Sequence, residues 1–165
     1  MSFLDSAEDP QKAQRRPLYA FLILTLGTGA VGSLFTSPAI PTWYASLNHP
    51  SITPPNWVFA PVWTALYILM AFAAWRVWKK TGLRSLEMAA FAVQLALNLG
   101  WSIVFFGLHQ IGAALIEIAI LDLAILATLI LFYRRDRLAG LLFAPYLAWT
   151  LFATLLTQTF GQLNQ

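Results

Sequence analysis

The chain has 165 residues, of which 59% are hydrophobic and only 10% are charged. Because a soluble domain carries roughly 25% charged residues, this composition excludes an ordinary cytosolic enzyme, a disordered chain and a nucleic-acid-binding domain. The absence of cysteine excludes disulfide scaffolds, thiolate metal sites and cysteine nucleophiles. The composition therefore predicts an integral membrane protein.

Five apolar segments are long enough to cross roughly 30 Å of hydrocarbon as helices. They cover residues 18–35, 57–78, 86–108, 111–132 and 138–160. A polar leader covers residues 1–17, a long connection covers residues 36–56, and a short tail covers residues 161–165. The segments are continuously apolar rather than alternating, which favours helices over barrel strands. We expect an all-α integral membrane protein whose five transmembrane helices form one bundle, a single domain over residues 18–160.

The Lys and Arg residues follow a one-sided pattern along these segments. The ten lie before the first segment or in and next to the second and fourth connections: Lys12, Arg15, Arg16, Arg76, Lys79, Lys80, Arg84, Arg134, Arg135 and Arg137. Positive residues are retained on the cytoplasmic side of a membrane protein. The pattern predicts a multi-pass protein of the cytoplasmic membrane with a cytoplasmic N-terminus and a C-terminus on the far side.

The connection over residues 36–56 carries five prolines together with Trp43, Tyr44 and His49. Proline stiffens such a segment, and Trp and Tyr suit a membrane interface. Loops of this length are often functional. Two interpretations stay open: an interfacial anchor, or a lid over a pocket.

Small residues recur in the first segment. The run 27–32 (GTGAVG) satisfies the glycine pattern of dinucleotide-binding loops, but that loop must join a strand to a helix. Because residues 27–32 lie inside a predicted membrane helix, we reject the dinucleotide-binding interpretation. Thr25, Gly29 and Ser33, spaced by four, instead predict a face for close helix packing.

Polar side chains inside the bilayer are costly and need an explanation. Gln94, Asn98, Trp101 and Ser102 share one face of the third segment. They indicate either interhelical hydrogen bonding or the polar wall of a ligand cavity, and both interpretations place this face inward.

Glu117 and Asp122 lie in the fourth segment. Five helical positions separate them by about 140°, so they do not form one carboxylate pair. Each is expected to be protonated or hydrogen-bonded. Proton-coupled transport has no basic or histidine relay to support it, and His49 and His109 are expected at the surface rather than as ligands of a metalloporphyrin. No metal-ligating cluster is visible.

Tryptophan is the distinctive residue, with seven copies. Trp63, Trp101 and Trp149 lie deeper in their segments than the others. Their faces suit a broad planar ligand, although helix packing is the alternative for each one alone.

Several motifs occur in order along the chain. They are Trp43 and Tyr44 with Pro50, residues 54–63 (PPNWVFAPVW), residues 94–101 (QLALNLGW), residues 105–107 (FFG) and residues 145–153 (PYLAWTLFA). With these motifs the sequence resembles the translocator protein family, also called the tryptophan-rich sensory protein or peripheral-type benzodiazepine receptor family, and in particular its bacterial members.

The resemblance implies five transmembrane helices, a homodimer, and a pocket closed by the first loop that binds porphyrins, notably protoporphyrin IX. Trp63 and Trp149 match tryptophans proposed to act on porphyrin and are the candidate catalytic residues. The implied ligand-binding residues are Trp43, Phe59, Trp63, Asn98, Trp101, Trp149, Ala153 and Leu156. No cofactor or metal is required, since the porphyrin is the ligand.

The sequence departs from the family at several positions. Ile52 stands where many members have Trp, and Ala113 stands where animal members have Trp. Residues 156–161 lack the Tyr and the basic residue of the cholesterol motif. Membrane lipids are expected partners, but sterol specificity is not.

The resulting hypothesis is a receptor-like membrane protein that binds tetrapyrroles, with a sensing or regulatory role in tetrapyrrole metabolism or stress. One alternative is a light- and oxygen-dependent activity that degrades the porphyrin through tryptophans. The other is a transporter of tetrapyrroles or sterol-like lipids.

Overall fold

The computed structural model describes residues 10–164, with side chains from residue 16 onward. In chain order the elements are α1 (Pro10–Ala39), the π-helical turn η1 (Ile40–Tyr44), α2 (Asn56–Thr81), α3 (Leu86–Ser102), the π-helical turn η2 (Ile103–Gly107), α4 (Ile111–Arg135) and α5 (Arg137–Leu163). Five of these helical stretches are long and apolar enough to cross a membrane, and the described residues contain no strand. The expected all-α, five-helix fold is confirmed. Residues 1–9 of the expected polar leader lie outside the described residues.

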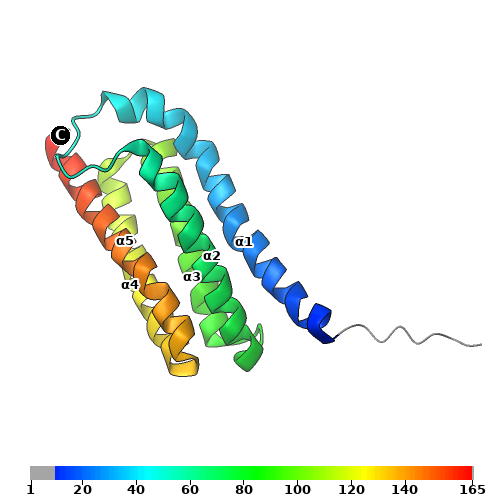
Figure 1. The fold of residues 1–165 in the computed structure, drawn as a ribbon. Coiled ribbons are helices and arrows are strands. Elements are labelled where there is room, and N and C mark those ends of the chain that lie inside the picture. Colours follow the sequence, from blue (N-terminus) through cyan, green and yellow to red (C-terminus); the bar gives the residue numbers. More distant parts are fainter. Residues whose placement is uncertain (1–9, 165) are drawn as a thin grey trace, which may run out of the picture.

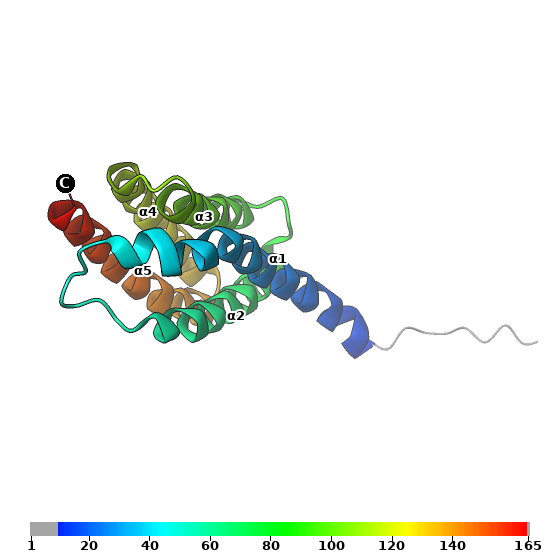
Figure 2. The ribbon, with the colours of Figure 1, turned by 90° about the horizontal axis from the view of Figure 1, so that it is seen from above.

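The helices run up and down and pack as a ring in the order α1, α2, α5, α4, α3 (Figures 1 and 2). Neighbours in this ring are not always neighbours in sequence, since α2 packs on α5. Figure 2 shows α1 lying between α2 and α3 and closing the ring. A bundle arranged in this way has an interior that all five helices line.

The half of the interior near the second and fourth connections is filled by side chains. Ala71, Ala73 and Ala74 of α2 are fully buried and allow close approach of the neighbouring helices. Phe132 and Phe143 pack edge to face with ring centroids 5.1 Å apart. This end of the interior is therefore closely packed.

The first helix extends beyond its expected end at Phe35, so the connection expected over residues 36–56 is much shorter. The expected boundary rested on Pro38 and Pro41, but helical structure continues to residue 46. A proline removes one backbone donor, and hydroxyl side chains and wider π turns can satisfy the freed groups in a membrane helix. Here η1 supplies the wider turn, and the Thr42 hydroxyl donates to the Pro38 carbonyl at 2.8 Å.

The other helix boundaries shift by a few residues. α2, α4 and α5 each extend three residues past the expected ends, because charged and polar residues can continue a helix beyond the hydrocarbon. The third segment ends in η2 rather than as regular α-helix. Gly82, with a φ of 74°, ends α2, and Ser85 caps α3 by accepting from the Met88 N–H.

Charged residues tie four helices together at one end of the bundle. The buried Asp136 accepts from Arg76 Nη2 at 2.8 Å and pairs with Lys80 Nζ at 2.9 Å. Arg135 pairs with the buried Glu87. Burial raises the pKa of Asp136, but the hydrogen bonds from Lys80, Arg76 and the Ala139 N–H outweigh it and hold that pKa well below its ordinary value.

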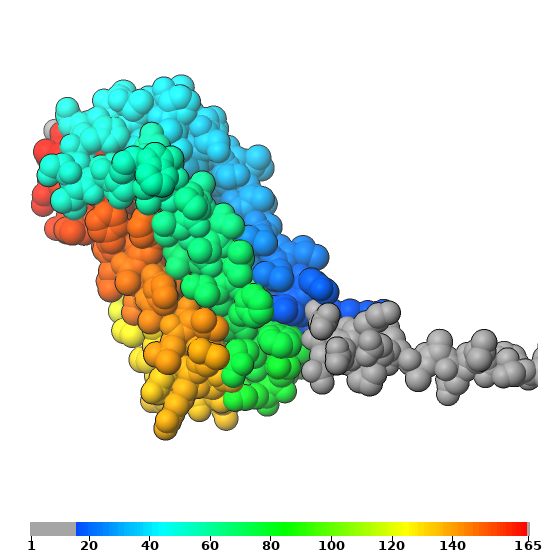
Figure 3. Space-filling view, viewed as in Figure 1, coloured from blue at the N-terminus to red at the C-terminus, as the bar shows by residue number. Residues whose placement is uncertain are grey.

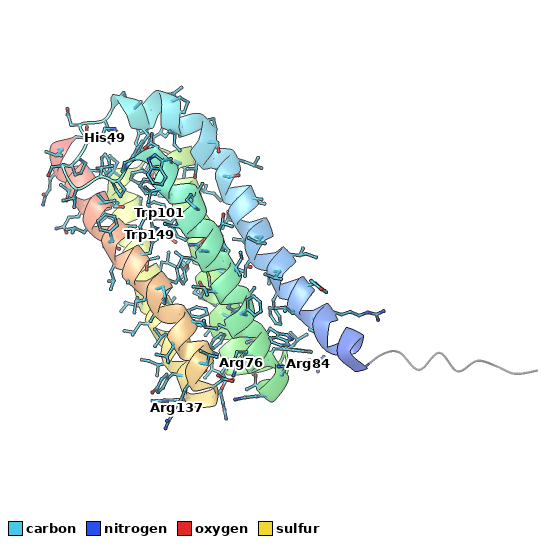
Figure 4. The ribbon with its side chains drawn as sticks, viewed as in Figure 1. His49, Arg76, Arg84, Trp101, Arg137 and Trp149 are labelled. Carbon is cyan, nitrogen blue, oxygen red and sulfur yellow. The ribbon has the colours of Figure 1, made fainter. Side chains whose placement is uncertain are left out.

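Figure 4 places Arg76, Arg84 and Arg137 at this end and His49 at the other. The basic clusters of the second and fourth connections therefore meet in space, as the one-sided charge pattern predicts. The end with the charged residues is the packed end, and the opposite end is the one with room for a site.

Candidate functional site

A cavity of about 390 Å³ lies in the half of the bundle opposite the charged end. Its walls come from α1, η1, α2, the end of α3 with η2, and α5, whereas no residue of α4 lines it. Small-molecule sites occupy about 300–1,000 Å³, so this volume suits a ligand rather than a few waters.

Tryptophans from three helices line this cavity: Trp63 of α2, Trp101 of α3 and Trp149 of α5. The Trp101 ring stacks on Phe105 with centroids 5.2 Å apart, and the Trp149 ring meets Phe59 edge to face at 5.9 Å. These ring contacts hold the indoles in place. Figure 4 shows Trp101 and Trp149 in the upper half of the bundle, away from the labelled arginines.

The wall that α1 contributes consists mostly of small residues. Gly29 lies so close to Tyr67 that a Cβ atom there would be 2.5 Å from the ring carbon Cε2, and one at Gly32 would be 3.3 Å from the Ser102 hydroxyl oxygen. Thr25 is fully buried one turn earlier. The close-packing face predicted in this helix is confirmed at Thr25 and Gly29, while Ser33 lines the cavity.

The floor of the cavity is a tyrosine backed by an amide. The Tyr67 hydroxyl donates to Asn98 Oδ1 at 2.6 Å, and Asn98 is only 2% exposed behind it. Gln94 is fully buried deeper in the bundle, while Trp101 and Ser102 line the cavity. This polar face points inward as predicted, but only half of it reaches the cavity.

The roof of the cavity is η1, and the loop 47–55 contacts η1 without lining the cavity itself. Ile40 and Tyr44 line the cavity, and the Tyr44 ring packs on Phe160 with centroids 5.3 Å apart. His49 Nε2 lies 3.0 Å from the Tyr44 carbonyl oxygen. The space-filling view shows this segment covering one end of the bundle (Figure 3).

The loop is fastened to the end of α5 by a pair of asparagines. The Asn48 N–H donates to Asn164 Oδ1 at 2.8 Å, and Asn164 Nδ2 donates to the Asn48 carbonyl at 3.1 Å. Asn48 Nδ2 donates in addition to the Leu163 carbonyl at 3.2 Å. Of the two interpretations of this segment, its position over the cavity favours the lid.

The two intramembrane carboxyl groups lie outside the cavity. Asp122 accepts from the Thr154 hydroxyl at 2.7 Å. The carboxyl oxygens of Glu117 are buried without a hydrogen-bond partner among the described residues, and one of them faces Gly100. They are not a pair, as predicted, and neither lines the cavity.

Neither histidine lines the cavity. The His109 ring stacks on Trp43 with centroids 4.3 Å apart, and His49 contacts Tyr44 as described. Within residues 10–164 there is no group of three or more His, Asp or Glu side chains arranged to hold a metal ion.

The residues implied by the resemblance divide into two groups. Those that line the cavity are Phe59, Trp63, Trp101, Trp149, Ala153 and Leu156. Trp43 does not, because η1 turns it towards His109 and Phe105, and Asn98 does not, because Tyr67 stands in front of it.

Sequence reasoning missed several lining residues, among them Tyr44, Tyr67, Phe105 and Phe160. Tyr67 follows Trp63 by four positions and therefore shares its helix face, a signal that could have identified it. Gly29 and Ser33 of α1 lie on the small-residue face that their spacing predicts, but that spacing indicates helix packing and not a cavity.

These features define a multi-pass membrane protein with an aromatic cavity under a capping segment. The family model described as the TspO/MBR family matches residues 20–163. The chain belongs to this family, which confirms the resemblance drawn from its motifs.

Similar proteins come from distant organisms. The chain is 40% identical over 148 residues to the tryptophan-rich protein TspO of Archaeoglobus fulgidus, covering 89% of this chain and 96% of that one. It is 40% identical over 130 residues to the human translocator protein, covering 76% and 77% of the two chains. It is 44% identical over 112 residues to the tryptophan-rich sensory protein of Cereibacter sphaeroides, covering 68% and 70%.

Proposed function

We propose that this protein binds planar tetrapyrroles such as protoporphyrin IX in the cavity and acts as a sensing or regulatory receptor. The observation that carries the proposal is that Trp63, Trp101 and Trp149 come from three different helices to line one cavity. Indole faces bury and stack on broad aromatic rings, which is the interaction that a planar macrocycle requires.

The shape of the cavity supports a ligand as broad as a tetrapyrrole. Ala30 and Ser33 of α1, with Ala60 and Thr64 of α2, line it and are exposed, and the cavity is only partly enclosed. We place its opening sideways between these two helices. A large ring can extend into this opening, and a hydrophobic ligand can enter from the lipid.

A titration tests binding. Protoporphyrin IX is added in the dark to the detergent-purified protein while tryptophan fluorescence is followed, and we expect saturable quenching. Phe keeps an aromatic ring but buries less area than the indole, so Trp63→Phe with Trp149→Phe should weaken binding several-fold. Trp57→Phe is the matched control, since Trp57 is 75% exposed and outside the cavity. Quenching that does not saturate would contradict the proposal.

Light-dependent degradation of the porphyrin is the second candidate. It is favoured by the position of Trp63 and Trp149 at one cavity, where both indoles would meet the same bound ring. Following the porphyrin absorbance under light separates the two functions. Bleaching that requires both tryptophans supports catalysis, whereas a stable spectrum with saturable binding supports the receptor.

For the topology we propose that the charged end faces the cytoplasm and that the cavity lies towards the far side of the cytoplasmic membrane. The clustering of basic residues at one end supports this orientation (Figure 4). Because the chain has no cysteine, single variants Leu83→Cys and Ser51→Cys report on the two ends through an impermeant maleimide. Labelling of Leu83→Cys in intact cells would contradict this orientation.

The homodimer that the resemblance implies stays a prediction.

A further inference from the structure

The lining of the cavity carries no ionisable acid or base apart from tyrosine. Among the described residues that line it there is no Lys, Arg, His, Asp or Glu. The polar groups of its lining residues are hydroxyls, the Asn56 amide and the indole N–H groups of the tryptophans, and the Trp101 indole nitrogen is buried without a hydrogen-bond partner within the described chain. The site is therefore polar in places but uncharged throughout.

No described cation can reach into the cavity from elsewhere. Arg76 follows Tyr67, the lining residue of α2 nearest to it, by nine positions, which is about 14 Å along the helix axis at 1.5 Å per residue. Arg16 precedes Leu26, a lining residue of α1, by ten positions, or about 15 Å on the same scale. These separations exceed the length of one side chain.

The histidines near the roof do not supply the missing charge. His49 and His109 are the nearest candidates by position, but neither lines the cavity. His109 is exposed and stacks on Trp43, and His49 contacts the Tyr44 carbonyl. Glu117 of α4 does not face the cavity either, since its carboxyl group faces Gly100 of α3. An anionic group inside the cavity would have only uncharged donors around it.

This matters for a porphyrin because its carboxylates and its ring have opposite requirements. A carboxylate moved from water into an apolar site without a cationic partner is strongly disfavoured. The ring gains from the tryptophan faces. The two requirements are met together only when the ring lies inside and the carboxylates remain in contact with water.

The lateral opening has a polar end where this is feasible. Ser37 lies near the end of α1 and Asn56 begins α2, and both line the cavity and are exposed. Their hydroxyl and amide groups offer uncharged hydrogen bonds at the end of the bundle remote from the charged residues. The remaining exposed lining residues, such as Ala30 and Ala60, lie deeper along the same opening.

We propose that the cavity selects the uncharged macrocycle itself, and that the carboxylates of a bound tetrapyrrole lie outside it at the rim formed by Ser37 and Asn56. This inference rests on the proposed tetrapyrrole binding and adds which chemical class the site prefers. An uncharged macrocycle, such as a porphyrin ester, should be bound at least as tightly as the dicarboxylic acid.

The first test compares protoporphyrin IX with its dimethyl ester, which has the same ring without the charges. Both are titrated in the dark against tryptophan fluorescence in the same detergent. We expect the Kd of the ester to be equal to or lower than that of the acid. An acid that binds tenfold more tightly than the ester overturns the inference, because it requires a cationic partner for the carboxylates. If neither ligand gives saturable quenching, the proposed function itself fails.

A variant in which a large side chain fills the cavity controls for partition of the ligands into the detergent. Ala153 lines the cavity and is half-buried, so Ala153→Phe should abolish saturable quenching by both ligands. Quenching that persists in this variant would show that the ligands do not occupy the cavity. Circular dichroism verifies that the variant retains its helices.

The second test adds a charge at the rim. Ser37→Arg should tighten binding of the acid several-fold and leave the ester unchanged. Ser46→Arg is the matched control, because Ser46 is exposed near the same end but does not line the cavity. If the two variants affect the acid equally, or if neither does, the carboxylates do not lie at this rim and the inference is wrong.

Discussion

The hydroxyl of Tyr67 donates a 2.6 Å hydrogen bond to Oδ1 of Asn98, joining α2 to α3 beneath the cavity. Both side chains are buried, so this bond has no competition from water. Tyr67 thus has two roles: its ring forms the floor of the cavity, and its hydroxyl satisfies a polar group that would otherwise be orphaned in the bilayer.

Replacing Tyr67 with Phe separates these two roles. The ring remains, but Asn98 Oδ1 loses its donor, which should lower the free energy of unfolding by about 1–2 kcal/mol. Unfolding in a mild detergent titrated with SDS measures this loss. Tyr19→Phe is the control, since Tyr19 is 57% exposed and should behave as the parent protein. Equal stability of all three proteins would show that the bond contributes nothing.

A side chain at Gly29 should disrupt the contact between α1 and α2. A Cβ there would be 2.5 Å from Tyr67 Cε2, and the bond to Asn98 prevents the ring from moving away. We expect Gly29→Ala to cost about 1–3 kcal/mol through overpacking. Gly27→Ala is the matched control because nothing lies within 4 Å of its Cβ position, and Ala favours the helix there. Similar melting temperatures for both variants would contradict the close contact.

Asp136→Asn should destabilise the charged end by about 1–2 kcal/mol at neutral pH, through loss of the charged hydrogen bonds from Arg76 and Lys80. Asn keeps the cap of α5, because its side-chain oxygen can still accept from the Ala139 N–H. Unfolding of the parent and variant proteins is compared at neutral pH.

The same substitution has a defined pH dependence. The pKa of Asp136 is lower in the folded protein than in the unfolded chain, so its contribution is complete above the ordinary value of about 3.9. The contribution is lost as the pH falls from there through the folded-state pKa. The stability difference between parent and Asp136→Asn should therefore shrink below about pH 4. A difference that is constant from neutral to acidic pH would refute the ion-pair account.

Unfastening the loop should speed ligand release. Asn164→Ala removes both hydrogen bonds between its side chain and the Asn48 backbone, at the point where the loop meets α5. We expect the dissociation rate of a bound porphyrin to rise several-fold while the midpoint of unfolding changes little, because these groups are exposed. Stopped-flow displacement measures the rate. Gln162→Ala, an exposed change on the same turn, should leave it unaltered, and a lid function is excluded if both variants release ligand at the parent rate.

The arrangement of these residues was only partly predictable. The five membrane helices followed from the length and continuity of the apolar segments, because hydrocarbon tolerates no unpaired backbone group and so permits few structures. The inward face with Gln94 and Trp101 followed from helical spacing. The course of α1 past Pro38 did not, because a π turn and the Thr42 hydroxyl offset the lost donor.

The sequence by itself determined the class of structure, the single end at which the basic residues gather, and the family. Each depends on local chemistry or on the order of motifs along the chain. Only the tertiary structure decided that α2 packs on α5, that Tyr67 stands between Asn98 and the cavity, and that Trp43 faces His109 instead of the ligand site. These relationships join residues that are far apart in sequence, and lipid-facing and core-facing surfaces are both apolar. Close packing and hydrogen bonding therefore select the partners, and hydrophobicity cannot.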